Sequence, residues 1–259
     1  MKYNSGQAFL GSPKKSITLM GMSGVGKSTL ALKMKGWGWA LYSCDEMIGT
    51  KFLAADIESA SSADNTDSAG SEAISTANIS ALSAFIGKIG ALPFAEFKRR
   101  QNLYYEAECA AVREAALMAA QHDKFVHDSS GSLCEITDGA VLNAIGAASL
   151  IVYIEAAQSD RLAILQRAQD YPKPLFFPPS QLDAWVQEYL AIYNEIESAD
   201  DIPPDEFLRW VFPRLFDMRA PKYELIAERW GVALRAEDVY AVQSEADLLA
   251  LIARALDEQ

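Results

Sequence analysis

A glycine-rich segment near the amino terminus constrains the fold more than any other feature of this chain. Residues 21–28 read Gly-Met-Ser-Gly-Val-Gly-Lys-Ser, which satisfies the pattern GxxxxGKS. A β-rich run at 16–20 precedes the segment, and a run with helical spacing of Leu30, Leu32 and Met34 follows it. The glycines let the backbone curl around an anion, so that successive N–H groups and the helix N-terminus point at it. The sequence therefore predicts a strand, a phosphate-binding loop (P-loop) and a helix in that order.

The loop also supplies the nucleotide and metal ligands that we predict. Lys27 is expected to reach the β- and γ-phosphates, and the Ser28 hydroxyl is expected to complete a magnesium site. The predicted cofactors are therefore ATP and Mg²⁺. The predicted nucleotide-binding residues of the loop are Gly21, Met22, Ser23, Gly24, Val25, Gly26, Lys27, Ser28 and Thr29.

The rest of the chain alternates between strand-like and helical runs. Three further compact apolar runs, at 39–43, 124–128 and 150–154, predict strands, and 232–234 predicts a fifth. The clearest helix is expected at 97–120, which is rich in Ala, Glu and Leu and contains no Gly or Pro. Strands that alternate with helices imply right-handed crossovers and a parallel sheet covered on both faces. We expect one α/β domain over 1–259.

Two segments depart from this rhythm and are expected to be mobile. Ser and Ala dominate 54–83, which predicts a weakly helical or irregular surface insertion, with a solvated loop that lacks chemistry as the favoured reading. Four prolines in 171–179 predict a stiff lid or a hinge. This segment is the first part of a predicted lid and helical insertion over 171–212. A helix at 182–196 and an acidic turn at 198–205 are expected to follow. The last predicted helix, at 244–256, begins with a Ser-Glu-Ala-Asp capping sequence.

Two aspartates follow predicted strands, at the sheet edge where open α/β folds bind ligands. Asp128 closes the run 124–128 and is placed to orient magnesium-bound water, although such a residue also serves as a helix or turn cap. Asp45 follows the run 39–43 and could position a substrate hydroxyl for in-line attack, or could equally cap the next helix. The predicted catalytic residues are Lys27, Asp45 and Asp128. The small-residue turn 129–132 could bring backbone amides to a substrate or γ-phosphate.

The charge of the chain limits its partners. With 35 acidic and 23 basic residues the formal net charge is -12, which argues against a broad electrostatic grip on nucleic acid or on an anionic membrane. An anionic ligand must therefore be held by a local cluster of bases. We expect a small-molecule substrate, no nucleic-acid or membrane partner, and a monomer or weak homodimer.

Cysteine usage and hydropathy indicate the compartment. The three cysteines, Cys44, Cys109 and Cys134, lie far apart without a CxxC pair, which favours free thiols in a reducing environment. With only two histidines, a transition-metal cage is disfavoured. The longest uncharged stretch, 139–154, falls short of the ~20 apolar residues that span a bilayer, and the first 15 residues lack the apolar core of a signal peptide. We expect a cytoplasmic protein.

The order of these motifs resembles shikimate kinase and its close P-loop relatives. Residues 21–31 look like the nucleotide loop of that family, and Asp45-Glu-Met-Ile48 looks like its Asp-x-x-Ile segment. The resemblance implies the strand order 2-3-1-4-5 in a three-layer fold. Further segments that are similar to the family pattern are Glu-Phe-Lys-Arg-Arg at 96–100, Ser-Gly-Ser at 130–132, Arg167 with Lys-Pro-Leu-Phe at 173–176, and Arg-Ala-Pro-Lys-Tyr at 219–223.

The resemblance implies roles for the matching residues. Arg167 would contact the nucleotide, and Arg219 would bind a substrate carboxylate. Lys98 and Lys173 stand where the family has arginines, and lysine lacks the bidentate fork of a guanidinium, so the acceptor is left open. The implied substrate-binding residues are Asp45, Lys98, Arg99, Ser130, Gly131, Lys173 and Arg219. The metal ligands predicted from the loop motif and the strand end are Ser28 and Asp128.

We therefore expect a magnesium-dependent phosphotransferase that moves the γ-phosphoryl group of ATP to a hydroxyl of a small anionic metabolite. A nucleotide-binding module that uses ATP or GTP as a switch is the alternative from another class. A GTPase is disfavoured because the sequence contains no Asn-Lys-x-Asp segment. A toxin-type kinase that acts on a nucleotide sugar or an antibiotic shares the loop and is not separated from a metabolic kinase by the sequence.

Overall fold

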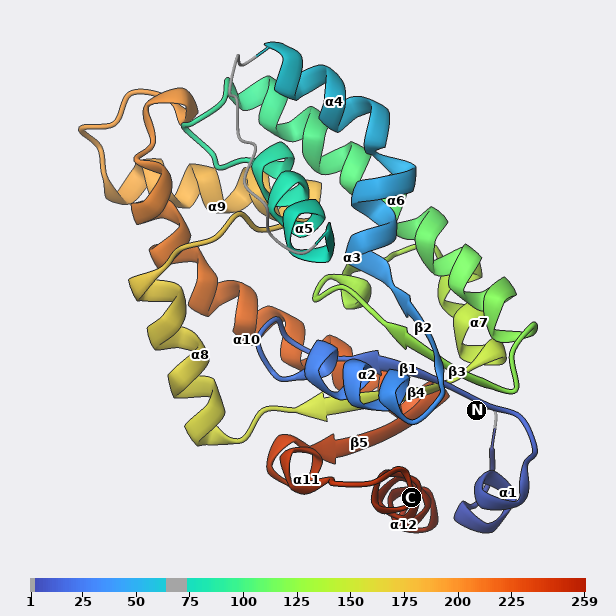
Figure 1. Ribbon diagram of the computed structural model, residues 1–259. Helices are drawn as coiled ribbons and strands as arrows, with labels where there is room; N and C mark the ends of the chain where they lie inside the picture. The colour runs from blue at the N-terminus through green and yellow to red at the C-terminus, as the bar shows by residue number, and fades with distance from the viewer. Residues whose placement is uncertain (1–2, 64–73) are drawn as a thin grey trace. The chain divides into compact units, whose positions relative to one another are not determined.

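The chain contains a parallel five-stranded sheet with helices on both of its faces (Figure 1). The computed structural model describes residues 3–63 and 74–259. The strand order β2-β3-β1-β4-β5, with every neighbouring pair parallel, confirms the predicted fold class and order. The strands are β1 (Lys15–Met20), β2 (Ala40–Ser43), β3 (Lys124–Asp128), β4 (Leu150–Glu155) and β5 (Gly231–Arg235).

Helices cover both faces of this sheet. The crossovers from β1 to β2 and from β3 to β4 run in opposite directions, so right-handed connections put α2 (Lys27–Gly36) and α7 (Gly139–Ala148) on opposite faces. The central strands β1 and β4 are buried over nearly their whole length; β4 reads as a continuous apolar run up to Glu155, whereas β1 carries the buried polar residues Ser16 and Thr18. The final helix, α12 (Glu245–Asp257), begins with the predicted capping box, in which Ser244 and Asp247 each accept a backbone N–H of the other.

The remaining elements are mostly helical. None of the helices in the described residues is long and apolar enough to cross a membrane. These elements are α1 (Gly6–Gly11), α3 (Cys44–Met47), the π-helical turn η1 (Ile48–Phe52), α4 (Ala54–Ala63), α5 (Ile74–Ile86), α6 (Phe94–Ala119), η2 (Leu133–Glu135), α8 (Gln158–Asp170), α9 (Pro179–Ile192), η3 (Ala199–Asp201), α10 (Pro204–Trp230) and α11 (Ala236–Ala241).

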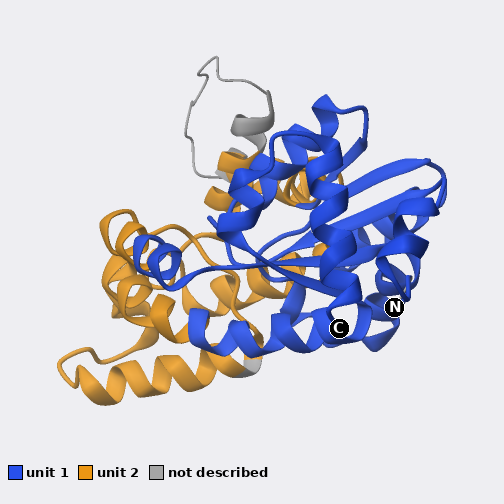
Figure 2. Ribbon diagram, turned by 90° about the horizontal axis from the view of Figure 1, so that it is seen from below, with its two compact units in different colours: residues 1–44, 109–164, 216–259 blue, residues 45–108, 165–215 orange. Residues whose placement is uncertain are grey.

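The chain divides into two compact units (Figure 2). Unit 1 contains residues 1–44, 109–164 and 216–259 and holds all five strands. Unit 2 contains residues 45–108 and 165–215 and is helical. The helices α3, α6, α8 and α10 each contribute residues to both units.

An aromatic cluster forms the core of unit 2. The Phe177 ring lies 6.1–6.3 Å, between centroids, from those of Phe97, Trp185 and Phe207, and Tyr189 packs edge-on against Phe207 at 5.3 Å. Trp185 and Tyr189 are therefore core residues of α9.

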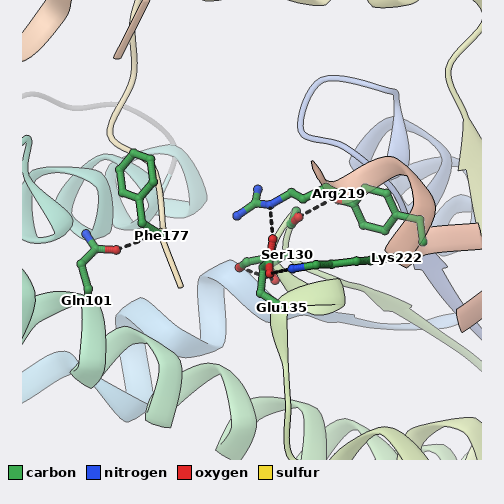
Figure 3. A network of polar contacts seen from close by, with 9 residues as sticks. Gln101, Ser130, Glu135, Phe177, Arg219 and Lys222 are labelled. Atoms are coloured by element: carbon green, nitrogen blue, oxygen red, sulfur yellow. Dashed lines mark hydrogen bonds and ion pairs between the residues drawn. The ribbon is translucent and has the colours of Figure 1, made fainter. Parts of the chain in front are cut away.

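Of the two unusual segments, one is more regular than expected and the other is irregular but partly buried. The insertion predicted at 54–83 forms the helices α4 and α5, and residues 64–73 of that prediction lie outside the described residues. The proline-rich segment is irregular up to Pro178, as expected, but Phe177 is buried and its N–H donates to the Gln101 amide oxygen at 2.9 Å (Figure 3). The carboxyl end of the predicted lid is thus fixed to the core of unit 2.

Two helices differ from the expectation because the effect of a proline depends on its position in a helix. Helix α9 begins at Pro179, three residues before the predicted start, since the first turn of a helix does not need the missing N–H. Helix α10 was not predicted as a continuous helix, because it runs through Pro213 and Pro221, where each ring removes one interior hydrogen bond.

A buried polar chain crosses the middle of the sheet. The Thr18 hydroxyl lies 2.6 Å from the Ser149 hydroxyl and 3.3 Å from Nδ1 of His127, which is fully buried in β3. Nε2 of His127 has no hydrogen-bond partner among the described residues. Burial lowers the pKa of His127 to about 3, so the imidazole is neutral in the folded protein.

We predict that this histidine makes stability depend on pH. An unfolded chain has a histidine pKa of about 6.5, so below this value the unfolded state binds a proton that the folded state rejects until the pH nears 3. The free energy of unfolding, measured with urea, should fall as the pH is lowered through this window, by up to about 1.4 kcal/mol per pH unit. His127→Asn should flatten the fall, whereas His122→Asn, which changes the half-exposed histidine, should keep it. An unchanged slope in His127→Asn would contradict the assignment.

Candidate functional site

The glycines of the loop adopt the backbone that the motif requires. Gly24 and Gly26 have φ values of 89° and 96°, a left-handed region in which other residues are strained. Lys27 begins α2, and its side chain is only 7% exposed. Its ammonium group donates to the carbonyl oxygens of Gly21 at 2.8 Å and Met22 at 3.1 Å, so the lysine folds back along its own loop.

The two predicted magnesium ligands contact each other. Asp128 ends β3 at the carboxyl edge of the sheet, in register with Leu19 of β1 and Ser43 of β2. The Ser28 hydroxyl hydrogen-bonds to its carboxylate. Burial raises the pKa of Asp128, and this effect is opposed by the Ser28 hydrogen bond and the charge of Lys27.

The other carboxylate oxygen of Asp128 provides a test of whether a cation fits here. Oδ1 is buried and accepts no hydrogen bond from any described residue. A hydroxyl oxygen and a carboxylate oxygen are ligands that Mg²⁺ prefers. The residues present at this edge therefore fit the magnesium ion that the loop implies.

The small-residue turn after β3 is held against the P-loop. The Ser129 hydroxyl donates to the Leu19 carbonyl at 2.7 Å, and the Ser130 and Ser132 hydroxyls lie 3.2 Å apart. A Cβ on Gly131 would lie 3.3 Å from the backbone nitrogen of Ser23, a separation that leaves little room for a side chain. The turn thus approaches the loop through its glycine.

A buried charge cluster lies beyond this turn, in the same unit (Figure 3). Nε of Arg219 donates to Oε1 of Glu135 at 3.1 Å, and the Lys222 ammonium pairs with Oε2 of the same carboxylate. The side chains of Arg219 and Glu135 are 4% and 1% exposed. The Tyr223 hydroxyl, from the next residue of α10, donates to the Gly131 carbonyl and so ties α10 to the turn.

Sequence reasoning missed Glu135, Lys222 and Tyr223 as members of this cluster. Lys222 and Tyr223 belong to the segment that carries Arg219, so proximity to that arginine was the available signal. For Glu135 the only signal was its place just after the 129–132 turn. Its partners lie more than 80 positions later in the chain, and no local pattern indicates such a contact.

The remaining predicted acceptor residues belong to unit 2. Asp45 lies in the first turn of α3, and the Tyr104 hydroxyl is 3.5 Å from its Oδ1. Lys98 makes a two-point ion pair with Asp183 of α9, at 2.8 and 2.9 Å. Arg99 pairs with Glu96 in the same helix.

Unit 2 contains three further bases in the segments that resemble the family pattern, namely Arg100, Arg167 and Lys173. Arg100, which the sequence did not single out, is the buried base of the 96–100 segment; it donates to Glu96 and to the Phe85 carbonyl and stacks on the Phe85 ring. Arg167 of α8 and Lys173 of the proline-rich segment are exposed, and within the described residues neither makes an ion pair. The structure thus groups the P-loop, Asp128, Ser130, Gly131 and Arg219 in unit 1, and Asp45, Lys98, Arg99, Arg167 and Lys173 in unit 2.

Comparisons with known proteins find similarity only at a low level. No family model and no curated protein matches the chain. Among solved structures, the chain is similar to shikimate kinase from Bacteroides thetaiotaomicron, with 12% identity and a TM-score of 0.45 over 93% of this chain and 95% of that one. It is also similar to shikimate kinase from Acinetobacter baumannii in complex with shikimate, with 15% identity, a TM-score of 0.43 and coverage of 95% and 92%.

A third similar structure is shikimate kinase from Aquifex aeolicus, with 14% identity, a TM-score of 0.32 and coverage of 78% and 97%. At such values the fold assignment rests on the strand order and the glycine loop of this chain itself. The chemistry of the site rests likewise on its own residues.

We predict that the loop tolerates no side chain at its last glycine. Gly26→Ala places a Cβ at φ 96° and 3.1 Å from a ring carbon of Tyr240, and should destabilise the protein by about 1–3 kcal/mol in urea unfolding. Gly36→Ala is the matched control, because it lies at the end of the same helix with no heavy atom within 4 Å of the new methyl group. That variant should be about 0.5–1 kcal/mol more stable than the native chain. Equal stability of the two variants would contradict the prediction.

Proposed function

We propose that this protein is a magnesium-dependent phosphotransferase that moves the γ-phosphoryl group of ATP to a hydroxyl of a small metabolite. The observation that carries the proposal is the joint position of Lys27, Ser28 and Asp128 at one edge of the sheet. A P-loop lysine, a hydroxyl and a strand-end carboxylate are the groups with which P-loop enzymes hold a nucleotide triphosphate and its metal ion.

The nucleotide side of the proposal follows from the loop. The backbone N–H groups of 21–29 would surround the phosphates, and Lys27 would exchange its contacts with the Gly21 and Met22 carbonyls for phosphate oxygens. Ser28 and Asp128 would hold the magnesium ion, which when bound neutralises charge on the phosphates. Arg167, an exposed base of α8, is proposed to contact the nucleotide.

The residues proposed to bind the acceptor, each from its match to a family segment, are Ser130, Gly131 and Arg219 of unit 1 and Asp45, Lys98, Arg99 and Lys173 of unit 2. Asp45 would orient the acceptor hydroxyl for in-line attack. The sequence favoured an anionic acceptor because bases gather in these segments. Three of those bases, however, are paired with carboxylates of the chain itself: Lys98 with Asp183, Arg99 with Glu96 and Arg219 with Glu135. We therefore propose a hydroxyl-bearing metabolite that is not strongly anionic.

Replacement of the loop lysine tests this function. Lys27→Ala should lower acceptor-dependent ADP release by a factor of about 100 to 1,000, because a positioned cation stabilises charge that develops during phosphoryl transfer. Lys35→Ala, which removes the same charge from the exposed end of the same helix, is the control and should stay active. ADP release should be measured with magnesium, ATP and a panel of neutral and anionic hydroxyl compounds that includes shikimate, nucleotide sugars and antibiotics.

Two outcomes would decide against the proposal. Full activity of Lys27→Ala would contradict the role of the loop. Saturable nucleotide binding without ADP release for any acceptor would favour a nucleotide-dependent switch instead.

A further inference from the structure

Glu135 is a buried carboxylate that serves two cations at once. One oxygen accepts from Nε of Arg219 and the other pairs with the Lys222 ammonium, so both oxygens are engaged (Figure 3). Glu135 ends the 3₁₀ turn η2, and its two partners lie on α10. Because Glu135 and Arg219 are almost wholly buried, the attraction between them is far stronger than that of a surface pair.

The geometry around Glu135 is that of a carboxylate-binding site. A guanidinium and an ammonium group that converge on one carboxylate are the donors with which proteins hold anionic ligands. Here the carboxylate belongs to the chain itself. Without it, the Arg219 guanidinium, whose side chain is 4% exposed, would lose its carboxylate partner, and the Lys222 ammonium, on a side chain that is 38% exposed, would lose the same partner. The loss of a counter-charge at a buried cation such as Arg219 is strongly unfavourable.

This cluster is connected to the P-loop by short contacts. Tyr223 follows Lys222 in α10 and donates to the Gly131 carbonyl. Gly131 in turn approaches the backbone of Ser23, in the loop. The cluster therefore adjoins the side of the phosphate loop at which Ser130 and Gly131 lie, where the proposed acceptor binds.

We propose that Glu135 determines the acceptor specificity of this site. Its carboxylate occupies the anion position formed by Arg219 and Lys222, so this corner takes an uncharged polar group of the acceptor and excludes a carboxylate or phosphate. The reference to an acceptor rests on the proposed function. The occupied anion position is a property of the folded chain alone.

If Glu135 acts as an internal anionic ligand, its carboxylate can be removed by mutation and replaced by acetate from solution. Glu135→Ala should be less stable than the native protein and should regain stability saturably with sodium acetate, measured as the unfolding midpoint against sodium chloride at equal ionic strength. The native protein and Glu135→Asp, which both keep the carboxylate, should show no response beyond that of chloride. Glu135→Ala combined with Arg219→Gln lacks the principal donor and should lose the acetate effect.

A milder variant covers the case in which Glu135→Ala does not fold. Glu135→Ala combined with Lys222→Gln leaves one uncompensated cation instead of two, and the fraction that refolds is measured at increasing acetate concentrations. No acetate dependence in this variant, whether it is folded or not, would overturn the proposal. An equal acetate response in the native protein would overturn it as well.

Specificity is measured with two acceptors that differ in one charge, namely shikimate and its methyl ester. The native enzyme should prefer the ester, and Glu135→Ala should shift the ratio of kcat/KM values toward shikimate by more than tenfold, because the emptied anion position then accepts the substrate carboxylate. Acetate rescue without phosphorylation of any acceptor would leave the anion position standing and defeat the proposed function. Phosphorylation with an unchanged preference in Glu135→Ala would defeat the specificity proposal alone.

Discussion

The contact between the Ser28 hydroxyl and the Asp128 carboxylate joins two segments that are far apart in the sequence, and the arrangement of the site depends on it. It requires β3 to lie next to β1, which follows from the strand order, and it requires α2 to begin directly after the loop. The left-handed glycines then bring the loop back over the strand ends. One oxygen of the Asp128 carboxylate remains buried without a hydrogen bond from any described residue, and a free carboxylate oxygen beside a hydroxyl suits a divalent cation.

An acidic chain that binds polyphosphate must control where its positive charge is available. In this protein the bases near the predicted site are largely compensated by carboxylates of the chain: Lys98 by Asp183, Arg99 by Glu96 and Arg219 by Glu135. Lys27 donates to the Gly21 and Met22 carbonyls of its own loop, and its charge also opposes the rise in the pKa of Asp128 that burial causes. Its positive charge is thus held next to the predicted metal ligand.

The sequence was sufficient for the parts of the fold that local patterns encode. The glycine spacing specified the loop, the apolar runs located all five strands within one or two residues, and the Ser244 cap located the last helix. Helix α10 was missed because its two interior prolines resemble helix breakers, whereas packing of the helix compensates for the lost hydrogen bonds. Long-range pairs such as Glu135 with Arg219 have no local signature, so the compensation of the site's charges was not predictable from motifs alone.

The energetics of the Glu135 cluster favour a role in recognition over one in stability. Desolvation of a buried ion pair offsets much of its Coulomb attraction, and apolar side chains of similar volume commonly stabilise a core as well or better. The two units bury many aromatic and aliphatic side chains elsewhere, so the fold does not lack apolar alternatives. A carboxylate that engages two cations beside the 129–132 turn therefore adds little net free energy to folding, which leaves room for the recognition role that we propose for Glu135.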